Sequence, residues 1–442
     1  MLRANDADKA CFQPRAKGRP WARICAAETS DLHKIPESYR GFTKVFSSEE
    51  SKKFPPARPW DHKIELKPGA PPTLISQNIR LSQPEMEELA KFIKEHEARG
   101  TIHPSKSPYA AAFFFIKKKN GKLHPVQDYR PVNEWTIKNR YPLPLIPQQI
   151  NRLHGCTLIT TVDILWGYNV VRIRKADCWK AAFTTPLGLY EPTVMFFGLT
   201  NSPATFQLVM NTIFREQIAR GTMTIYMDDI AVHTKPEEGE TEDQHLEWHR
   251  RLVKEMLTIL EEHDLFVNID KCQFEQESIE FLGVRVGRGR VEMQASKVDR
   301  VREWKPPRNV QEVRRFLGFT GYYRYFIKGY SSIAKPLIEL TRKTTPWRWG
   351  KEQNEAFDML RSKMCKKPVL QQPNFNKTFY LQTDASAYGV GAVLSQEGEG
   401  STTHKPKQHP IAYYSATFTP TEQNYNIFER EFLGVKKALV NW

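Results

Sequence analysis

Two short acidic sites, each beside an apolar stretch with strand character, place the strongest constraint on the fold of this chain. Asp163 ends the apolar run 158–162, and Asp228 and Asp229 lie inside a predicted hairpin at residues 222–234. Carboxylates that apolar neighbours hold at strand ends are costly to leave unpaired, so a cation is their natural partner. Aspartates from adjacent strands can bridge two Mg²⁺ ions about 3.5–4 Å apart and stabilise an in-line phosphoryl displacement. An isolated Asp-Asp pair is more often an ordinary turn, so the surrounding residues must decide.

The apolar pattern predicts a chain that contains both helices and strands. Asn120-Gly121 is a strong hairpin signal and joins the predicted strands 111–118 and 122–128. Residues 54–73 hold six prolines, so we expect this stretch to be extended. Other strand patterns cover residues 157–164, 183–194, 222–234, 379–383, 389–394 and 411–415. Helical spacing covers a segment that begins at Ser82 and the ranges 201–220, 245–263 and 426–442.

The chain carries a strong positive charge. Its 442 residues suggest about three domains, and 65 Lys and Arg against 50 Asp and Glu leave a net charge of +15. Residues 297–345 contain twelve Lys and Arg against four Asp and Glu, interleaved with aromatic side chains. Such a surplus predicts a polyanionic partner, with nucleic acid first and an acidic membrane surface second.

No stretch of the sequence predicts a membrane span or a secretory signal. A bilayer requires about 20 apolar residues, whereas the densest apolar run, 109–116, is long enough only for a buried strand. The N-terminus lacks the apolar segment that signal peptides carry. The six cysteines are scattered without a CxxC pair, which predicts reduced thiols rather than disulfides or a zinc module. We therefore expect an intracellular protein that is not secreted and has no membrane partner, in the cytoplasm or the nucleus.

The residues around the two acidic sites form a series of recognisable motifs. Tyr226-Met227-Asp228-Asp229 is a YMDD box, and a specified tetrapeptide arises by chance in a chain of this length on the order of a few times per thousand. The other matching blocks are Ile116-Lys117-Lys118-Lys119-Asn120-Gly121, Asp128-Tyr129-Arg130, Thr161-Val162-Asp163 with Tyr168, Phe197-Gly198-Leu199-Thr200-Asn201-Ser202-Pro203-Ala204-Thr205-Phe206-Gln207, and Phe281-Leu282-Gly283. Together they resemble the reverse transcriptase and RNase H region of the pol polyprotein of gypsy-type LTR retrotransposons, particularly fungal ones. The resemblance extends from about Ile35 to Trp442.

The resemblance implies an α+β fold of the right-hand polymerase type, with fingers, palm and thumb, followed by a truncated RNase H-like α/β domain. The implied parts are an unmatched tail (1–30), an extended Pro-rich segment (31–80), fingers and palm (81–296), thumb and connection (297–368) and the RNase H-like domain (369–442). The implied activity is that of an RNA-directed DNA polymerase, which adds dNTPs to a primer 3′-OH on an RNA or DNA template. Asp163 and Asp228 would bind a pair of Mg²⁺ ions, with Asp229 in support.

The resemblance also implies a nucleotide pocket. Tyr168 resembles the aromatic steric gate that fills the space of a ribose 2′-OH, and Phe197 and Gly198 correspond to the floor of the pocket, where glycine permits close backbone approach. Lys118 resembles the lysine that neutralises the incoming triphosphate, although a triple-lysine hairpin alone would be a solvated turn. His124 departs from the family, in which many members have an arginine. A neutral imidazole cannot supply a permanent bidentate cation, so we expect weakened nucleotide binding there.

The expected nucleic-acid contacts lie mainly in the basic stretch 297–345, which corresponds to a thumb that grips phosphates independently of sequence. Most of its aromatic residues, Phe316, Phe319, Tyr323 and Phe326, are expected in the helix core. The expected primer and template contacts are Arg130, Tyr226, Phe281, Leu282, Gly283, Arg314, Arg315, Arg324 and Lys328. The implied partners are an RNA template, a DNA or tRNA primer, an RNA–DNA hybrid and dNTPs, and the sequence indicates no oligomeric state.

Two carboxylates beyond Pro368 resemble the RNase H motifs of the same polyproteins. They are Asp384, in Thr383-Asp384-Ala385-Ser386, and Glu431, in the helical segment 429–433. Each alone would be an ordinary strand end or helix surface. Two-metal RNA cleavage needs further carboxylates, and the family's next aspartate falls beyond Trp442. We therefore expect this domain to be truncated and inactive.

The sequence leaves two other functions open. A non-catalytic nucleic-acid-binding remnant of a retroelement is favoured by His124, by the unmatched residues 1–30 and by the end of the sequence at Trp442. Intact carboxylates at all three polymerase positions favour the enzyme instead. A nuclease that acts through Asp384 and Glu431 is the third and weaker hypothesis.

One histidine pair has the spacing of a metal site. His245 and His249 stand at i, i+4 on a predicted helix, a spacing that can bind Zn²⁺. Neither an HExxH box nor a third ligand accompanies them. We therefore expect a solvated helix face.

Overall fold

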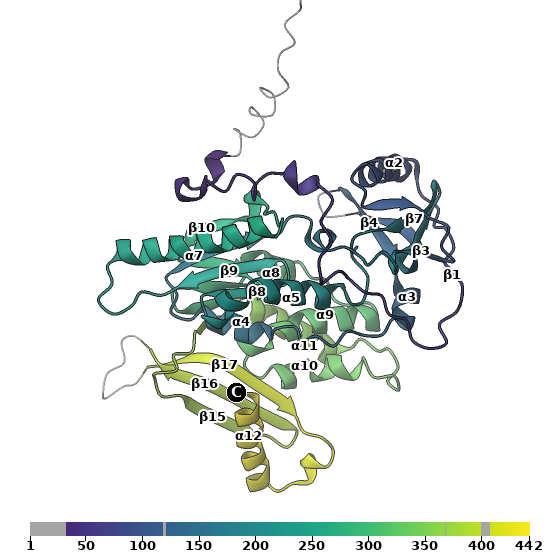
Figure 1. Ribbon diagram of the computed structural model, residues 1–442. Coiled ribbons are helices and arrows are strands. Elements are labelled where there is room, and N and C mark those ends of the chain that lie inside the picture. Colours follow the sequence, from purple (N-terminus) through teal and green to yellow (C-terminus); the bar gives the residue numbers. More distant parts are fainter. Residues whose placement is uncertain (1–31, 118–120, 367, 399–406) are drawn as a thin grey trace, which may run out of the picture.

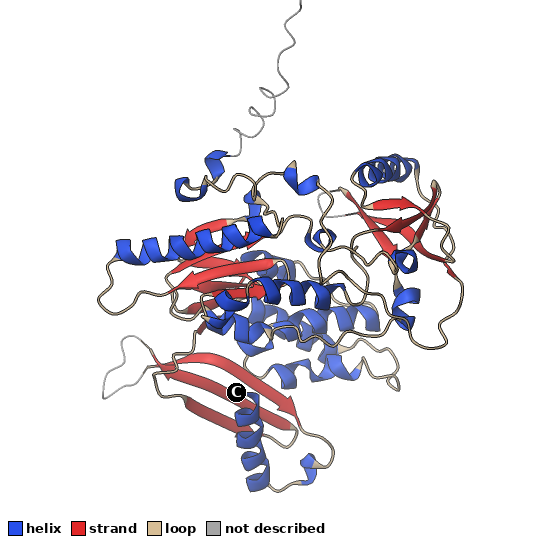
Figure 2. Cartoon of the chain, viewed as in Figure 1, coloured by secondary structure: helices blue, strands red, loops and turns tan. Residues whose placement is uncertain are grey.

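The computed structural model describes residues 32–117, 121–366, 368–398 and 407–442. Within these ranges the strands form four sheets, against which the helices pack, as Figures 1 and 2 show. In Figure 1 the blue fingers lie at the right, the teal palm in the middle, and the yellow C-terminal sheet at the bottom. The expected α+β fold is confirmed.

The palm is built on an antiparallel sheet with the strand order β10-β5-β9-β8. Its strands are β5 (Leu158–Asp163), β8 (Met223–Tyr226), β9 (Asp229–Thr234) and β10 (Gln273–Gln276). The predicted strand at 157–164 and the predicted hairpin at 222–234 are both confirmed. Their apolar residues hold the strands in place, because side chains such as Ile159 and Ile230 are fully buried.

Helices cover the palm sheet, and the structure refines two predictions about them. They are α5 (Ser202–Ile213), α6 (Arg215–Ala219) and α7 (Glu242–Glu262). The predicted helix at 201–220 is divided at Phe214, whose φ of −106° and ψ of 24° leave the helical range. The predicted helix at 245–263 begins earlier, at Glu242, because Thr241 and Gln244 form a capping box.

The fingers are a mixed sheet with the order β1-β3-β6-β7-β2, in which β4 also pairs with β3. Its strands are β1 (Leu74–Ile75), β2 (Ile102–Pro104), β3 (Tyr109–Lys117), β4 (Leu123–Asp128), β6 (Phe183–Thr185) and β7 (Gly188–Pro192). Helix α2 (Gln83–Ala98) packs against β2 and β4, and α3 (Arg130–Trp135) follows β4. The predicted strands 111–118 and 122–128 are confirmed as β3 and β4, although residues 118–120 of their turn lie outside the described ranges. The predicted start of α2 is confirmed by its cap, Ser82.

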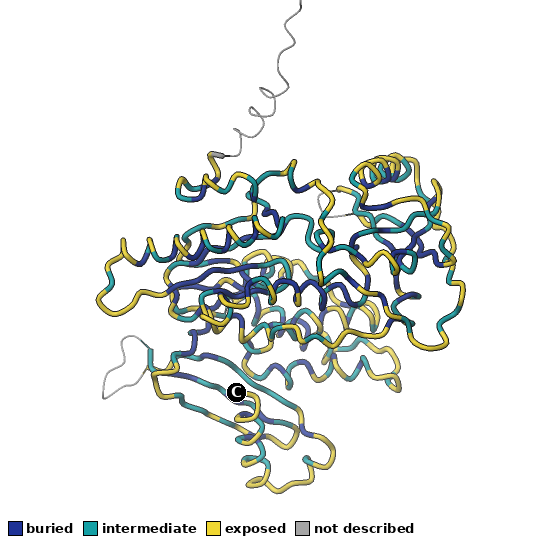
Figure 3. Tube along the Cα trace, viewed as in Figure 1, coloured by how far each residue is buried: buried dark blue, intermediate teal, exposed yellow. Residues whose placement is uncertain are grey.

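The Pro-rich segment ahead of α2 packs into the core that palm and fingers share. It runs extended across palm and fingers with short 3-10 turns, among them η3 (Glu50–Lys52). Ile35, Tyr39, Val45 and Ile64 of this segment join the apolar core that palm and fingers share. Figure 3 shows the buried positions in dark blue, concentrated along the palm and fingers strands.

The thumb helices share a second apolar core with a sheet that the sequence did not predict. The helices are α8 (Ala295–Arg302), α9 (Val310–Tyr322), α10 (Tyr330–Glu339) and α11 (Lys351–Cys365). The sheet is formed in chain order by β11 (Ser278–Phe281), β12 (Val284–Gly287), β13 (Arg290–Met293) and β14 (Val369–Gln371). The domain boundary predicted between residues 296 and 297 therefore lies inside α8. The boundary predicted at 368 separates β14 from β13, although the two strands pair. As expected for most of the thumb aromatics, Phe316, Tyr323 and Phe326 are buried, whereas Phe319 is half-buried.

The C-terminal part is an antiparallel sheet, β15-β16-β17, with helix α12 packed on β15 and β16. The elements are β15 (Tyr380–Ala385), β16 (Gly389–Glu397), β17 (Gln408–Thr417) and α12 (Ile427–Asn441). They confirm the strands predicted at 379–383, 389–394 and 411–415 and the helix predicted at 426–442. Ser331 of α10 donates its backbone N–H to Ser415 Oγ of β17 at 2.9 Å, so this sheet contacts the thumb.

Within the described part of the chain, no helix is long and apolar enough to cross a membrane. The cysteines described there, Cys156, Cys178, Cys272 and Cys365, are free thiols. This agrees with the expectation of reduced cysteines. Cys11 and Cys25 lie outside the described ranges.

Candidate active site

The palm strands bring the three predicted catalytic aspartates together. Asp163, the last residue of β5, pairs in register with Asp229, the first residue of β9. Asp228 lies in the turn before β9, and the backbone N–H of Ile164 donates to its carbonyl oxygen at 3.3 Å. Met227 takes a positive φ of 55° in this turn. The sequence prediction that apolar strands would place these carboxylates side by side is thus explained by the strand register.

A buried glutamine supports this turn. Gln207 on α5 is fully buried, and its Oε1 accepts a hydrogen bond from the backbone N–H of Met227 at 2.8 Å. A positive φ is unfavourable for a residue with a side chain, so the turn needs such support. The sequence motif contained Gln207, but its role was not predicted. A glutamine among the apolar residues of a helix face was the available signal.

Burial and mutual repulsion affect the protonation of the carboxylates. Burial raises the pKa of Asp229 to about 6, with further contributions from Asp228 and Asp163. Burial also raises the pKa of Asp228, and the neighbouring Asp163 adds to this effect. Two carboxylates close together in a partly dry environment cannot both ionise freely. A cation at this position would relieve the repulsion.

Lys271 supplies one positive charge at the site, and the sequence did not predict it. Its Nζ lies 3.0 Å from both Oδ1 and Oδ2 of Asp163. The lysine side chain is 60% exposed and that of Asp163 is 21% exposed. Lys271 also partly offsets the effect of burial on Asp228 and Asp229, whose pKa values stay raised. Lys271 is more than a hundred positions from Asp163 in the sequence, so no local pattern could indicate this contact.

The chemistry of this site fits Mg²⁺. Asp163, Asp228 and Asp229 offer only carboxylate oxygens, which Mg²⁺ prefers over nitrogen or sulfur. Burial raises the pKa values of Asp228 and Asp229, and an added positive charge would favour their ionised forms. Among the described residues, no three His, Cys, Asp or Glu side chains are close enough to form a complete metal site.

The predicted nucleotide pocket forms an aromatic row beside the aspartates. The ring centroid of Tyr168 lies 4.9 Å from that of Phe197, and the centroid of His124 lies 6.3 Å from that of Phe197. The Tyr168 hydroxyl donates to Met227 Sδ at 3.4 Å, which connects the row to the turn that carries Asp228. Burial and the nearby Asp228 raise the pKa of Tyr168 to about 12, so this hydroxyl stays protonated. Lys118 lies outside the described ranges.

Gly198 follows Phe197 in a conformation that requires glycine. Its φ is +102°, and a Cβ atom there would lie 3.2 Å from the Tyr129 ring and 3.3 Å from the Gln127 carbonyl oxygen. Its own carbonyl oxygen accepts from Asn133 Nδ2 at 2.8 Å. The exposed Phe197 is therefore held on a fixed backbone.

Three of the predicted primer-contacting residues lie beside the palm aspartates. Leu282 and Gly283 line a cavity of about 360 Å³ together with Asp163 and Asp229. The Tyr323 hydroxyl donates to the Gly283 carbonyl at 2.9 Å, and Tyr322 donates to Leu282 in the same way. Phe281 lines this cavity too and is 3% exposed.

The predicted basic contacts are exposed but less closely connected to the aspartates. The side chains of Arg314, Arg315, Arg324 and Lys328 are all on the surface of the thumb. Arg324 lines a cavity of about 820 Å³ that also includes Tyr226 of the catalytic hairpin. Arg130 is 86% exposed and pairs with Asp128 at 2.6 Å, so its guanidinium is on the surface of the fingers.

Glu431, one of the two predicted RNase H residues, contacts the strand that carries the other, Asp384. Asp384 is exposed on β15, and the backbone N–H of the next residue, Ala385, donates to Glu431 Oε1 on α12 at 3.2 Å. The close approach of α12 depends on Gly434, where a Cβ atom would lie 2.8 Å from Val390 Cγ2.

The expectation of a solvated face at His245 and His249 is wrong. His245 is 5% exposed and His249 is fully buried between α7 and the palm sheet. His249 Nε2 lies 2.8 Å from Thr160 Oγ1 and Nδ1 lies 2.9 Å from Thr234 Oγ1, while His245 Nε2 lies 2.9 Å from the same Thr234 hydroxyl. The helix turns this face towards the sheet, where threonine hydroxyls provide hydrogen-bond partners.

Two segments of the chain match known protein families. Residues 116–286 match the reverse transcriptase (RNA-dependent DNA polymerase) family. Residues 349–442 match the RNase H-like domain found in reverse transcriptase. Both segments fall where the sequence motifs lie.

The curated relatives include transposon polyproteins of fission yeast. The chain is 34% identical to the transposon Tf2-3 polyprotein of Schizosaccharomyces pombe over 409 residues, which are 92% of this chain and 30% of that protein. The transposon Tf2-7 polyprotein of the same organism is 33% identical over the same coverage. The chain thus spans about 30% of the length of these relatives.

Solved structures share the fold. The foamy viral protease-reverse transcriptase in complex with an RNA/DNA hybrid superposes with a TM-score of 0.75 and 20% identity, over 97% of this chain and 57% of that chain. The same viral protein in complex with dsDNA gives a TM-score of 0.71 and 19% identity, over 98% of this chain and 87% of that chain. The expected right-hand polymerase fold is confirmed by this similarity.

Proposed function

The chain carries a reverse transcriptase domain followed by the RNase H-like domain found in reverse transcriptases, and it is homologous to gypsy-type retrotransposon polyproteins; from this premise we propose that it is an RNA-directed DNA polymerase. It adds dNTPs to the 3′-OH of a primer on an RNA or DNA template and releases pyrophosphate. The observation that carries the proposal is the in-register pairing of Asp163 with Asp229, with Asp228 in the adjoining turn.

The carboxylates are the centre of the proposed reaction. Asp163 and Asp228 would hold two Mg²⁺ ions with support from Asp229, and the ions would stabilise the attacking and leaving oxygens of an in-line displacement. The protein's own contribution is to fix the carboxylates by strand register and by the hydrogen bond between Gln207 and Met227. Fixed geometry lowers the barrier because the reacting groups need little reorganisation.

The aromatic row would receive the nucleotide. Phe197 is 53% exposed and offers its ring to a base or sugar, while Tyr168 packs against it. The Tyr168 ring would occupy the space of a ribose 2′-OH, so the pocket favours deoxyribonucleotides. His124 stands at the other end of the row, and its imidazole would bind the triphosphate more weakly than the arginine common in the family.

The thumb would grip the duplex of template and primer. Its exposed Arg314, Arg315, Arg324 and Lys328 lie within the stretch 297–345, which carries eight of the chain's surplus positive charges. Contacts of this kind bind phosphates regardless of base sequence. The proposed partners are an RNA template, a DNA or tRNA primer, their hybrid and dNTPs, and the foamy viral structures with an RNA/DNA hybrid and with dsDNA support nucleic acid as the partner.

The location of the protein in the cell and the inactivity of its RNase H-like part are also proposals. The four described cysteines are free thiols, which is typical of reducing compartments, and supports an intracellular location in a cytoplasmic virus-like particle or the nucleus. We also propose that the RNase H-like part does not cleave RNA, because two-metal cleavage needs further carboxylates beside Asp384 and Glu431. Incubation with a labelled RNA–DNA hybrid tests this second point, because any Mg²⁺-dependent cleavage by this chain contradicts it.

Primer extension on an RNA template tests the polymerase proposal. We expect Mg²⁺-dependent addition of dNTPs and salt-sensitive binding of the duplex. A protein that binds the duplex in a salt-sensitive way but extends no primer would be the non-catalytic remnant instead.

A further inference from the structure

The loop that carries Tyr168 contains a bulky residue in an unfavourable backbone conformation. Trp166 has a φ of 68° and a ψ of −7°, in the left-handed region. Bulky side chains rarely adopt this conformation, and it persists only where the surroundings enforce it. Trp166 lies three residues after Asp163 and two before Tyr168, so whatever holds it acts on the segment between the metal site and the nucleotide pocket.

The N-terminal segment holds the indole of Trp166. Its Nε1 donates to Ser51 Oγ at 3.0 Å, and Ser51 is only 6% exposed. The Ser51 hydroxyl in turn donates to the carbonyl oxygen of Ser48 at 2.7 Å. Since the serine proton is committed to Ser48, a lone pair of Oγ faces the indole N–H. The hydroxyl is therefore oriented as an acceptor for Trp166.

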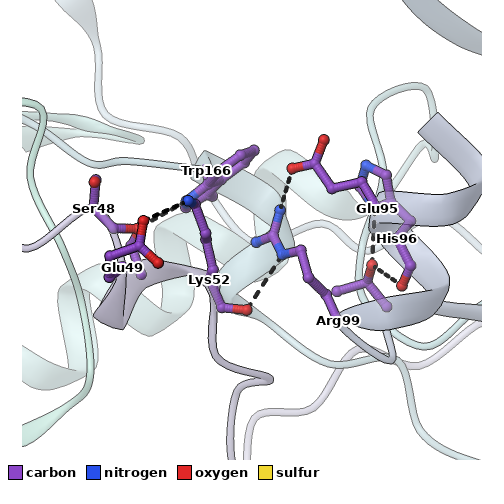
Figure 4. Close-up of polar contacts among 9 residues, drawn as sticks. Ser48, Glu49, Lys52, Glu95, His96, Arg99 and Trp166 are labelled. Carbon is purple, nitrogen blue, oxygen red and sulfur yellow. Dashed lines mark hydrogen bonds and ion pairs between the residues drawn. The ribbon is translucent and has the colours of Figure 1, made fainter. Parts of the chain in front are cut away.

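The fingers hold the same ring from the C-terminal end of helix α2. The guanidinium carbon of Arg99 lies 4.1 Å from the centroid of the Trp166 ring, a cation–π arrangement. Arg99 Nε donates to the Lys52 carbonyl at 3.3 Å, and its Nη1 lies 3.7 Å from Glu95 Oε1. Figure 4 shows Arg99 between these partners, with the side chain reaching from α2 towards Lys52. The arginine side chain is 10% exposed, so its position is well defined.

The backbone of Trp166 determines where Tyr168 lies. Trp166 is the residue before the 3-10 turn η4 (Gly167–Val170), and its carbonyl oxygen accepts from the backbone N–H of Asn169 at 3.0 Å. This hydrogen bond closes the turn around Tyr168. The Tyr168 ring then packs at 5.6 Å from Phe206, between centroids, as well as against Phe197. A rotation of Trp166 would displace this turn.

We propose that Trp166 is a positioning residue that fixes the Tyr168 ring against Phe197, and that Ser51 and Arg99 form a clamp that holds Trp166. The clamp thereby sets how strictly the pocket excludes the ribose 2′-OH. The inference rests on the proposed polymerase function. Ser51 and Arg99 both precede the segment 116–286 that matches the reverse transcriptase family, so this specificity determinant lies in the Pro-rich segment and at the C-terminal end of α2.

Two substitutions each remove one partner of the hydrogen bond between Trp166 Nε1 and Ser51 Oγ. Ser51→Ala removes the acceptor and keeps the indole, and Trp166→Phe removes the donor and keeps an aromatic ring for Arg99. Ser48→Ala is the matched control, because it removes an exposed hydroxyl in the same turn and leaves the backbone carbonyl that orients Ser51. The measurement is the ratio of kcat/KM for a dNTP to that for the corresponding rNTP in single-nucleotide primer extension.

We expect the ratio to fall by about three- to tenfold in Ser51→Ala and in Trp166→Phe, since a net hydrogen bond has about that effect. The double variant should fall no further than either single variant, and Ser48→Ala should keep the wild-type ratio. A structural defect alone would lower incorporation of both nucleotides and leave their ratio unchanged. If Trp166→Phe fails to fold, Ser51→Ala carries the test, since it leaves the ring in place.

Failure of the clamp and failure of the polymerase proposal give different results. An unchanged ratio in a stable and active Ser51→Ala protein overturns the clamp and leaves the polymerase intact. A wild-type protein that extends no primer overturns both.

Discussion

The ammonium group of Lys271 lies 3.0 Å from both carboxylate oxygens of Asp163. It thus places one positive charge on the carboxylate that is proposed to bind a metal ion. Metal binding must displace this contact or share Asp163 with it. The lysine is 60% exposed, so solvent screens the pair and the energetic effect is small.

Lys271→Met should strengthen metal binding. Without the lysine, the three aspartates repel one another more in the absence of metal, so we expect the Kd for Mn²⁺ to fall by about twofold to fivefold. Isothermal titration without nucleic acid measures this directly. Lys297→Met is the control, because Lys297 lines the same cavity and should leave the Kd nearly unchanged. Weaker Mn²⁺ binding by Lys271→Met would show that the lysine assists the metal rather than competing with it.

Gly198→Ala should destabilise the protein. A Cβ atom would lie 3.2 Å from the Tyr129 ring at a φ of +102°, and such overpacking costs about 1–3 kcal/mol. The free energy of unfolding from chemical denaturation gives the value. Gly318→Ala is the control, because Gly318 lies within α9 with nothing near its would-be Cβ. We expect that change to be neutral or stabilising by up to about 1 kcal/mol.

Gln207→Leu should loosen the catalytic turn. It leaves the Met227 N–H without its acceptor, which we expect to lower the free energy of unfolding by about 1–3 kcal/mol. The rate of primer extension should fall as well, because Asp228 follows Met227. Gln311→Leu, at an exposed position of α9, should change neither quantity. Full activity of Gln207→Leu would remove the glutamine from the support of the site.

Stability should decrease on acidification below neutral pH. Burial lowers the pKa of His249 to about 4, with Glu275 opposing this shift and His245 and Arg250 adding to it. The unfolded histidine has its ordinary pKa near 6.5, so between about pH 6.5 and 4 only the unfolded chain takes up this proton. The stabilisation is complete above pH 6.5 and lost as the pH falls.

The expected loss from pH 7 to 5 is about 1–2 kcal/mol from His249 alone. Chemical denaturation at both pH values measures it, and His233, whose pKa burial lowers to about 3, should contribute in the same direction. The pH dependence of His249→Gln should be weaker than that of the wild type. Identical pH dependence in both proteins would contradict the buried, neutral state of His249.

The sequence predicted those parts of the fold whose signal is local. The strands β5, β8 and β9 were predictable because apolar alternation and the turn residues at Asp228 lie within a few positions. The sheet β11–β14 was missed, because its strands have at most four residues and β14 pairs with a distant β13. A pattern so short does not distinguish a strand from a loop.

For the candidate site, too, the sequence predicted the parts that local motifs carry. The motifs indicated the aspartates and the aromatic row, whose members come together as expected. Contacts between distant segments give Lys271, Gln207 and Trp166 their roles. Rules based on residue spacing do not predict such contacts. The wrong expectation for His245 and His249 has a different cause. They lie seven residues before Leu252 and Met256, so helical spacing places them on the apolar face of α7, and the prediction overlooked this.

Single-nucleotide extension of a primer on an RNA template, with wild type compared to Asp228→Asn, tests the central claim most directly. Asp243→Asn serves as the control, because Asp243 is exposed in the first turn of α7. We predict Mg²⁺-dependent extension by the wild type and by Asp243→Asn. Extension by Asp228→Asn should fall about a hundredfold or more, since metal ions stabilise the transition state by several kcal/mol. Equal incorporation by wild type and Asp228→Asn would contradict a polymerase that works through these carboxylates.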